Sequence, residues 1–142
     1  MEKQRGQMSI FFALLLVSLV AFMLIAVEVG RVVYARGEVG KAADAAALAA
    51  ASRINIPLYR ETGQVVFLPD VYDTAQTYAT LNSSYLASRS IPVTVTGVYI
   101  DEGCQTVSVS VTANLSALLP SVLNYAKQYT VTGYAKGRLD GR

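Results

Sequence analysis

One uninterrupted apolar stretch, Gly6 to Val27, constrains this chain more than any other feature. Its 22 residues include no Asp, Glu, Lys or Arg. As an α-helix with a rise of about 1.5 Å per residue it would be roughly 33 Å long, which is enough to cross the hydrocarbon core of a bilayer. We therefore expect a membrane span at about residues 7–27, preceded by a basic leader at residues 1–6.

Such a leader and span are found both in cleaved signal peptides and in retained anchors. This span is longer than the apolar region of most signal peptides, and no small-x-small cleavage site separates it from the rest of the chain. A retained anchor is therefore the favoured interpretation. Lys3 and Arg5 then place the N-terminus in the cytoplasm and the rest of the chain outside the membrane.

The helix is expected to continue beyond the span, to about residue 54. Glu28 to Ser52 contains no proline and is rich in helix-forming residues. Three residues interrupt this pattern, and each costs about 1 kcal/mol relative to alanine in a helix interior: Gly30, Gly37 and Gly40. In the alanine run after them, Ala43 and Ala47 recur at i,i+4. Small residues of this kind suit either an alanine-rich helix packed on its own domain or a helix packed densely among copies of itself.

Residues 55–142 are expected to form one small outer domain. Pro57 ends the long helix, Gln64 to Leu68 has the composition of a short strand, and Asp70 is a candidate N-cap for a second helix from Val71 to about Ala87. The apolar stripe of that helix consists of Val71, Ala75, Tyr78, Leu81, Tyr85 and Leu86.

The remainder has the alternation typical of strands. Ile91–Ile100 and Val107–Thr112 flank turn residues at 101–103 and predict a hairpin, and Tyr129–Ala135 predicts a final strand. Between them, Leu115–Tyr125 is a short amphipathic segment interrupted by a proline. The fold class is therefore α+β: a long N-terminal helix, then a small antiparallel sheet of three or four strands with a packed helix on one side.

Composition argues against enzymes, metal proteins and nucleic-acid binders. The 142 residues include no His and a single Cys, and 12 basic against 10 acidic residues leave a net charge of only +2. No catalytic motif, metal-ligand set or cofactor-binding loop is present in the sequence. A cap and a turn explain the acidic pairs Asp70 with Asp73 and Asp101 with Glu102. Asn82 and Asn114 begin N-x-S/T tripeptides and are possible glycosylation sites.

The N-terminal 52 residues carry a specific resemblance. A leader with Arg5-Gly6-Gln7, an apolar span, the step Glu28-Val29-Gly30-Arg31 and the run Lys41 to Ala50 with its embedded Asp44 resemble the TadE/TadG-like proteins of the Flp (tight adherence) pilus system. Lys41 stands where that family often has Asn. The resemblance marks Glu28, Arg31 and Asp44 as family-motif residues.

The resemblance implies a pilin-like structural subunit whose N-terminal helix forms the core of a surface filament. Its partners would be other copies of itself or related pilins, and it would reside in the inner membrane before assembly. A prepilin-type peptidase would cut after Gly6, leaving Gln7 as the first residue. Phe11 departs from the pilin pattern, which usually has Glu there. Two alternatives therefore remain: a permanently anchored accessory component of the pilus machine, and a membrane-tethered binding module.

Overall fold

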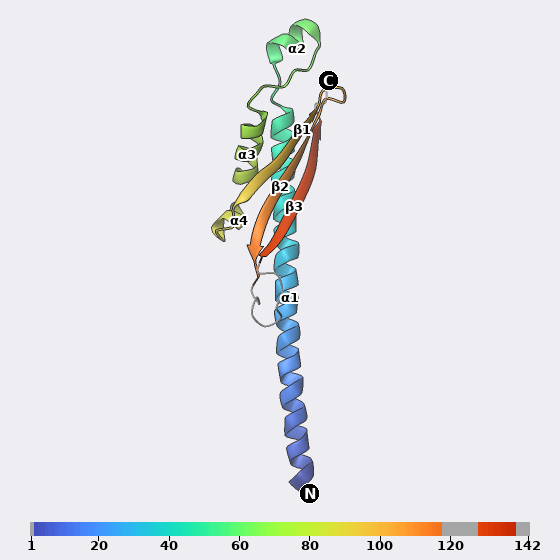
Figure 1. The fold of residues 1–142 in the computed structure, drawn as a ribbon, viewed down its shortest axis with the longest axis vertical. Coiled ribbons are helices and arrows are strands. Elements are labelled where there is room, and N and C mark those ends of the chain that lie inside the picture. Colours follow the sequence, from blue (N-terminus) through green and yellow to red (C-terminus); the bar gives the residue numbers. More distant parts are fainter. Residues whose placement is uncertain (1, 118–127, 139–142) are drawn as a thin grey trace.

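A single long helix, α1 (Glu2–Ala51), runs along most of the molecule; the helices and strands within residues 71–138 gather on its second half, and the short helix at residues 56–62 lies beyond its C-terminal end (Figure 1). The computed structural model describes residues 2–117 and 128–138. At about 1.5 Å per residue, the 50 residues of α1 extend for roughly 75 Å. The prediction that the apolar span and the alanine run form one helix is confirmed.

The segment after α1 differs from the prediction. α1 ends at Ala51, six residues before Pro57, so the proline does not end it. Pro57 lies in the first turn of a short helix, α2 (Ile56–Thr62), whose N-cap Asn55 accepts a hydrogen bond from the Leu58 amide at 3.2 Å. A proline suits this position because the first amides of a helix have no intrahelical partner. Gly63 ends α2 in the left-handed conformation, with φ of 71°.

The predicted strand at Gln64–Leu68 is wrong. This segment makes one isolated bridge, between Phe67 and Ile54, which consists of two backbone hydrogen bonds to the turn after α1. In these the Asn55 amide donates to the Val66 carbonyl at 2.8 Å and the Leu68 amide donates to the Arg53 carbonyl at 3.0 Å. Because α2 begins directly after Asn55, the available partner segment is too short to support a strand.

The predicted helix to Ala87 is divided into α3 (Val71–Leu81) and α4 (Ser84–Ser88). At the break, Asn82 Nδ2 donates to the Tyr78 carbonyl at 2.9 Å and Ser83 Oγ donates to the Thr80 carbonyl at 3.0 Å. Such local side-chain bonds compete with the helical backbone.

The buried stripe of α3 also differs from the prediction. It consists of Val71, Ala75 and Ala79, whereas Tyr78 and Leu81 are exposed. Asp70 does occupy the N-cap position of α3, but its side chain makes no capping hydrogen bond. Its carboxylate instead accepts from the Arg53 guanidinium, which ties the end of α1 to the start of α3.

Three antiparallel strands form one sheet in the order β1–β2–β3: β1 (Val93–Asp101), β2 (Thr106–Ser116) and β3 (Gln128–Arg138). The predicted α+β class and antiparallel sheet are confirmed. Leu115 is a buried residue of β2, so the predicted amphipathic segment does not begin there. Residues 118–127 of that segment lie outside the described residues.

The edge of β1 is closed by side chains from α3. Gln76 Oε1 accepts from the Val95 amide at 2.8 Å, and its Nε2 donates to the Val93 carbonyl at 3.2 Å. Tyr72 Oη donates to the Val95 carbonyl at 2.8 Å. Backbone groups that a further strand would otherwise satisfy are thus paired within the domain.

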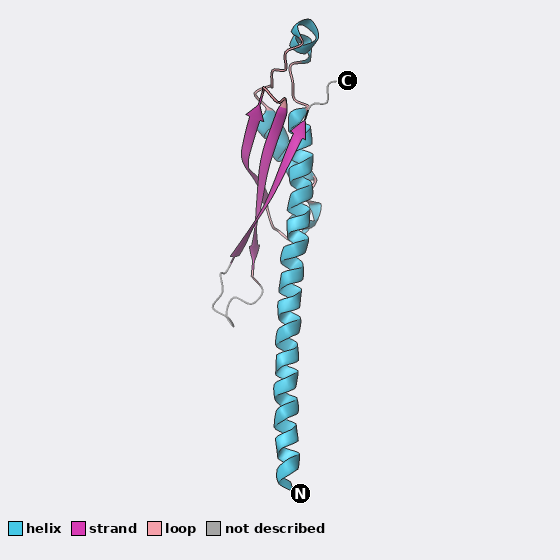
Figure 2. Cartoon of the chain, turned by 90° about the vertical axis from the view of Figure 1, so that its right-hand side faces the viewer, coloured by secondary structure: helices cyan, strands magenta, loops and turns pink. Residues whose placement is uncertain are grey.

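The core lies between the sheet and the second half of α1, with α3 packed alongside (Figure 2). Alternate residues of β2 point into it, and α1 contributes almost only alanines. The α1 members are Ala35, Val39, Ala42, Ala43, Ala46, Ala47, Ala50 and Ala51. Small side chains allow the backbones of helix and sheet to approach closely.

Two glycines of β3 make this approach possible. A Cβ added at Gly133 would lie 2.8 Å from the Val39 carbonyl oxygen, and one added at Gly137 would meet the Ala47 carbonyl. The four residue steps from Gly133 to Gly137 in the strand span about 13 Å, and the eight steps from Val39 to Ala47 in the helix span about 12 Å. Strand β3 therefore runs along α1 with closely matched spacing.

Candidate assembly interface

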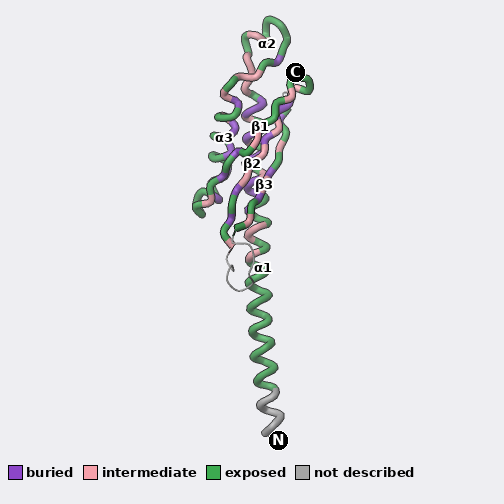
Figure 3. The backbone as a smooth tube through the Cα atoms, viewed as in Figure 1, coloured by how far each residue is buried: buried purple, intermediate pink, exposed green. Residues whose placement is uncertain are grey.

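Residues 8–27 of α1 project from the domain and are exposed (Figure 3). All residues from Met8 to Val27 are exposed, and Phe11, Leu16 and Phe22 have 62%, 62% and 74% of their surface accessible. By length and composition α1 has one segment able to cross a membrane, and none of that segment is buried within the described fold. A helix that is apolar all round needs lipid or other protein around it.

The second half of α1 has two distinct faces. The inner face carries Ala43 and Ala47, which are 0% and 1% exposed in the chain's own core. These two predicted packing residues therefore contact the outer domain of the same chain.

The opposite face of α1 is free. At about 100° per residue, Gly37 lies only about 20° around the axis from Gly30, and Leu48 returns to the angle of Gly30 after five turns. We define the free face as Gly30, Gly37, Lys41, Asp44 and Leu48, all of which are exposed. Leu48 is 67% exposed, so this face presents a large apolar side chain at one end and two glycines at the other, with Lys41 and Asp44 between them.

The helix glycines meet nothing within the chain. A Cβ added at Gly30, Gly37 or Gly40 would have no atom within 4 Å outside the local backbone. Gly40 is only partly exposed and lies towards the side of the free face. Nothing in the described fold thus requires a glycine at these positions, although each lowers helix stability by about 1 kcal/mol relative to alanine.

The family-motif residues lie at two levels of α1. Arg31 Nη1 donates to Glu28 Oε2 at 3.3 Å, an i,i+3 ion pair just beyond the apolar span. Asp44 lies on the free face and, within the described part of the chain, forms no ion pair. The neighbouring Lys41 is paired instead with Glu38 at 2.6 Å, which raises the pKa of Lys41 through that hydrogen bond and the charge of Glu38.

The remaining predicted site residues are dispersed. Gly6 and Gln7 lie within the helical backbone of α1. Asn82 is exposed at the end of α3, and Asn114 is exposed on β2, where its Oδ1 accepts from Thr130 Oγ1 at 2.9 Å. Cleavage after Gly6 and glycosylation at either asparagine stay predictions.

Residues 2–117 and 128–138 contain no group of three or more side chains suited to a metal ion. Cys104 is exposed in the β1–β2 turn, where its amide donates to Asp101 Oδ1 at 3.0 Å and thereby lowers the pKa of that carboxyl.

Sequence reasoning missed the two glycines of β3 that let the sheet lie against the inner face of α1, Gly133 and Gly137. The alternation in the last strand predicts that Gly133 shares a face with Val131, as observed, but it predicts neither the contact of Gly133 with α1 nor any role for Gly137. The sequence does contain a signal for this contact. Two glycines four residues apart in a strand lie on the same face of the sheet and leave a surface without side chains, on which a helix can pack closely.

A comparison with family models matches residues 6–53, and the matching model is described as "Putative Flp pilus-assembly TadE/G-like". The N-terminal helix region, residues 6–53, is thus similar to that of the TadE/G-like Flp pilus-assembly family. The match covers the apolar span, the Glu28–Arg31 pair and the free face of α1. Searches of curated proteins and of solved structures found no match.

Proposed function

We propose that this TadE/G-like chain is a pilin-like, non-enzymatic structural subunit of a Flp/Tad-type surface filament. Before assembly the apolar half of α1 is held in the inner membrane, with the outer domain outside the cytoplasm. During assembly the same surface leaves the lipid and packs against other copies of itself or related pilins.

The observation that carries this proposal is that much of α1 makes no contact with the rest of the described fold. Residues 8–27 are exposed all round, and the free face continues the exposed side of α1 alongside the domain to Leu48. Glycines that serve no contact within the chain are accounted for if a neighbouring helix approaches there, because a helix backbone comes closest to another where side chains are absent. The exposed Tyr99 and Tyr134 of the sheet would remain available for adhesive contacts.

Phe11 favours a second candidate function. A pilin-type Glu at this position would pair with the new N-terminal amine of a neighbouring subunit, and phenylalanine cannot. The chain would then be a permanently anchored accessory component of the pilus machine, uncut at Gly6. The two functions differ in where the protein is found and in its N-terminal residue.

Intact-mass analysis of the protein from sheared surface filaments and from membranes tests the choice. The subunit proposal expects the chain in filaments, beginning at Gln7; the same spectra show whether mass is added at Asn82 or Asn114. A chain present only in membranes, and beginning at Met1, would reject the subunit proposal in favour of the accessory component.

Gly37→Leu tests the free face directly. A leucine there fits the isolated chain, since nothing lies within 4 Å, but it would hold a neighbouring helix away. We expect sheared filament protein to fall at least tenfold while the amount of protein in the membrane is unchanged. Gly103→Leu, in the exposed β1–β2 turn, is the matched control and should assemble normally. Normal filaments from Gly37→Leu would exclude this face from the assembly contact.

A further inference from the structure

A pocket with two arginines lies where α1 leaves the apolar span. It has a volume of about 190 Å³ and lies between α1, α4 and the end of β2. Arg31 and Arg89 supply its charge, and Leu86, Ile91 and Leu115 supply apolar surface. We call this the base pocket.

Arg89 is held in place by an aromatic pair. The Tyr34 ring of α1 meets the Tyr85 ring of α4 edge-on, with centroids 4.5 Å apart, and the Arg89 guanidinium carbon lies 5.5 Å from the Tyr85 centroid. A guanidinium over a ring face is attracted by the ring quadrupole and keeps its donors free. Among the described residues Arg89 has no acidic partner.

The charge in the base pocket suits an anion. Arg31 forms an ion pair with Glu28 at 3.3 Å. The two arginines and this one carboxylate together leave a net charge of +1. Arginine presents several N–H donors in a planar arrangement that matches the oxygens of a phosphate group. A phosphodiester could accept from both guanidinium groups while the apolar part of its molecule covers the leucine and isoleucine surface.

The position of the base pocket along α1 indicates that the phosphate would belong to a lipid headgroup. Arg31 lies four residues, or about 6 Å of helix, beyond Val27, the last residue of the apolar span. The headgroup region of a bilayer extends about 5–7 Å beyond the hydrocarbon on each side. Tyr34, which meets Tyr85, lies three residues or about 4.5 Å further from the apolar span than Arg31.

We propose that the base pocket binds the phosphate of an anionic phospholipid in the leaflet that faces the outer domain. This rests on the proposed membrane placement of α1 before assembly. The bound lipid would fix the outer domain against the membrane surface, because its ligands come from both α1 and α4.

The experiment uses the full chain in lipid nanodiscs made either of phosphatidylcholine alone or with one third phosphatidylglycerol. Native mass spectrometry after release counts the lipids that stay bound. We expect one phosphatidylglycerol to be retained, and Arg89→Gln to reduce its retention at least fivefold. Arg89→Lys keeps the charge but not the planar donors and should give an intermediate loss.

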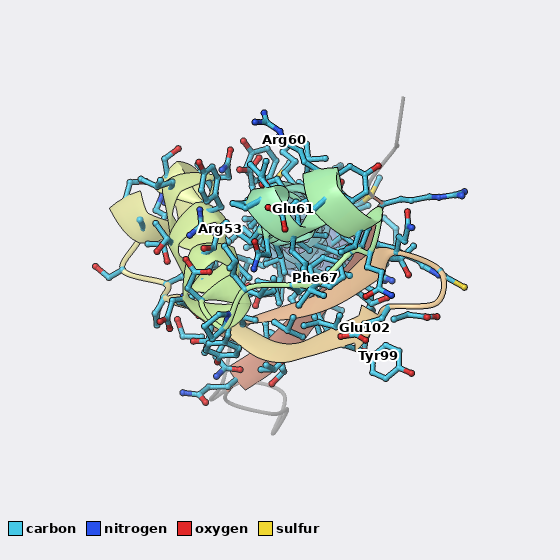
Figure 4. The ribbon with its side chains drawn as sticks, turned by 90° about the horizontal axis from the view of Figure 1, so that it is seen from above. Arg53, Arg60, Glu61, Phe67, Tyr99 and Glu102 are labelled. Carbon is cyan, nitrogen blue, oxygen red and sulfur yellow. The ribbon has the colours of Figure 1, made fainter. Side chains whose placement is uncertain are left out.

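Arg60→Gln is the matched control. Arg60 is an exposed arginine of α2 at the opposite end of the domain, where it points away from the fold (Figure 4). Equal retention by wild type and Arg89→Gln would overturn the proposal, as would an equal loss in Arg60→Gln. Displacement of the lipid by millimolar inorganic phosphate would identify a free-anion site instead and also overturn it.

Failure of the underlying membrane placement has its own signature. If the full chain does not enter phosphatidylcholine nanodiscs, α1 is not a membrane span, and both proposals fall together. If it enters them but shows no preference for phosphatidylglycerol, the membrane placement stands and only the base-pocket proposal is rejected.

Discussion

The glycines of α1 and the glycines of β3 have opposite surroundings. Gly30, Gly37 and Gly40 interrupt a helix, and a Cβ added there would meet no atom of the described chain beyond the local helix, whereas Gly133 and Gly137 interrupt a strand and lie against the helix backbone. The β3 glycines serve the fold, since no side chain would fit between strand and helix. The α1 glycines weaken the fold slightly, which points to a use outside the isolated chain.

The largest effect is expected from Gly137→Ala. The added Cβ would overlap the Ala47 carbonyl group and crowd Ala51, so helix and strand must separate along the core. Overpacking of this kind costs about 3 kcal/mol. Urea unfolding of the full chain in mild detergent measures this loss in the free energy of unfolding.

A graded series sharpens that expectation. Gly133→Ala, with its closest contact at 2.8 Å, should destabilise the chain less than Gly137→Ala. Gly97→Ala, in β1 of the same sheet, is the control, because its Cβ would lie 3.6 Å from Ser110 Oγ in ordinary contact. Equal stabilities for all three variants would show that β3 is not pressed against α1.

The elements that the sequence predicts well are those whose signal is local. The apolar span and the alanine run define α1 without reference to anything else, and the alternation of Val107, Val109 and Val111 defines the inner face of β2. The break at Asn82 was missed because the pattern of apolar residues continues across it. There the side-chain bonds of Asn82 and Ser83 end the helix.

The candidate interface was only half predictable. The sequence identifies Gly37 and Ala47 as small residues, but it cannot distinguish the side that faces the chain's own sheet from the free side. That distinction depends on where β3 crosses, about 90 residues later in the chain. The base pocket likewise joins Arg31 to Arg89, which no local pattern connects.

Gly37→Ala is expected to stabilise the chain, by less than Gly137→Ala destabilises it. Alanine stabilises a helix interior by about 1 kcal/mol relative to glycine, and no atom within 4 Å opposes the new methyl group. Thermal unfolding of the full chain in detergent should therefore shift upwards. A destabilised Gly37→Ala chain would mean that the free face is already in contact within the fold.

The smallest effect concerns the ion pair between Arg53 and Asp70, which joins the end of α1 to the start of α3. The hydrogen bond from Arg53 lowers the pKa of Asp70 below its usual value. Because the folded pKa is depressed, the stabilisation is present above the unfolded value of about 3.9 and is lost as the pH falls through the folded pKa. Both side chains are about two-fifths exposed, so solvent screening keeps the contribution small.

Asp70→Asn separates this pair from general acid effects. At pH 7 the variant should unfold at slightly lower urea concentration than wild type, and the two should converge as the pH falls through the folded pKa of Asp70, because the wild-type carboxyl is then protonated. Asp73→Asn, an exposed carboxylate in the first turn of α3, is the matched control and forms no ion pair among the described residues. If the difference between Asp70→Asn and wild type persisted unchanged at low pH, the Asp70 side chain would stabilise the junction through packing, and the charge of the pair would contribute nothing to holding α3 against α1.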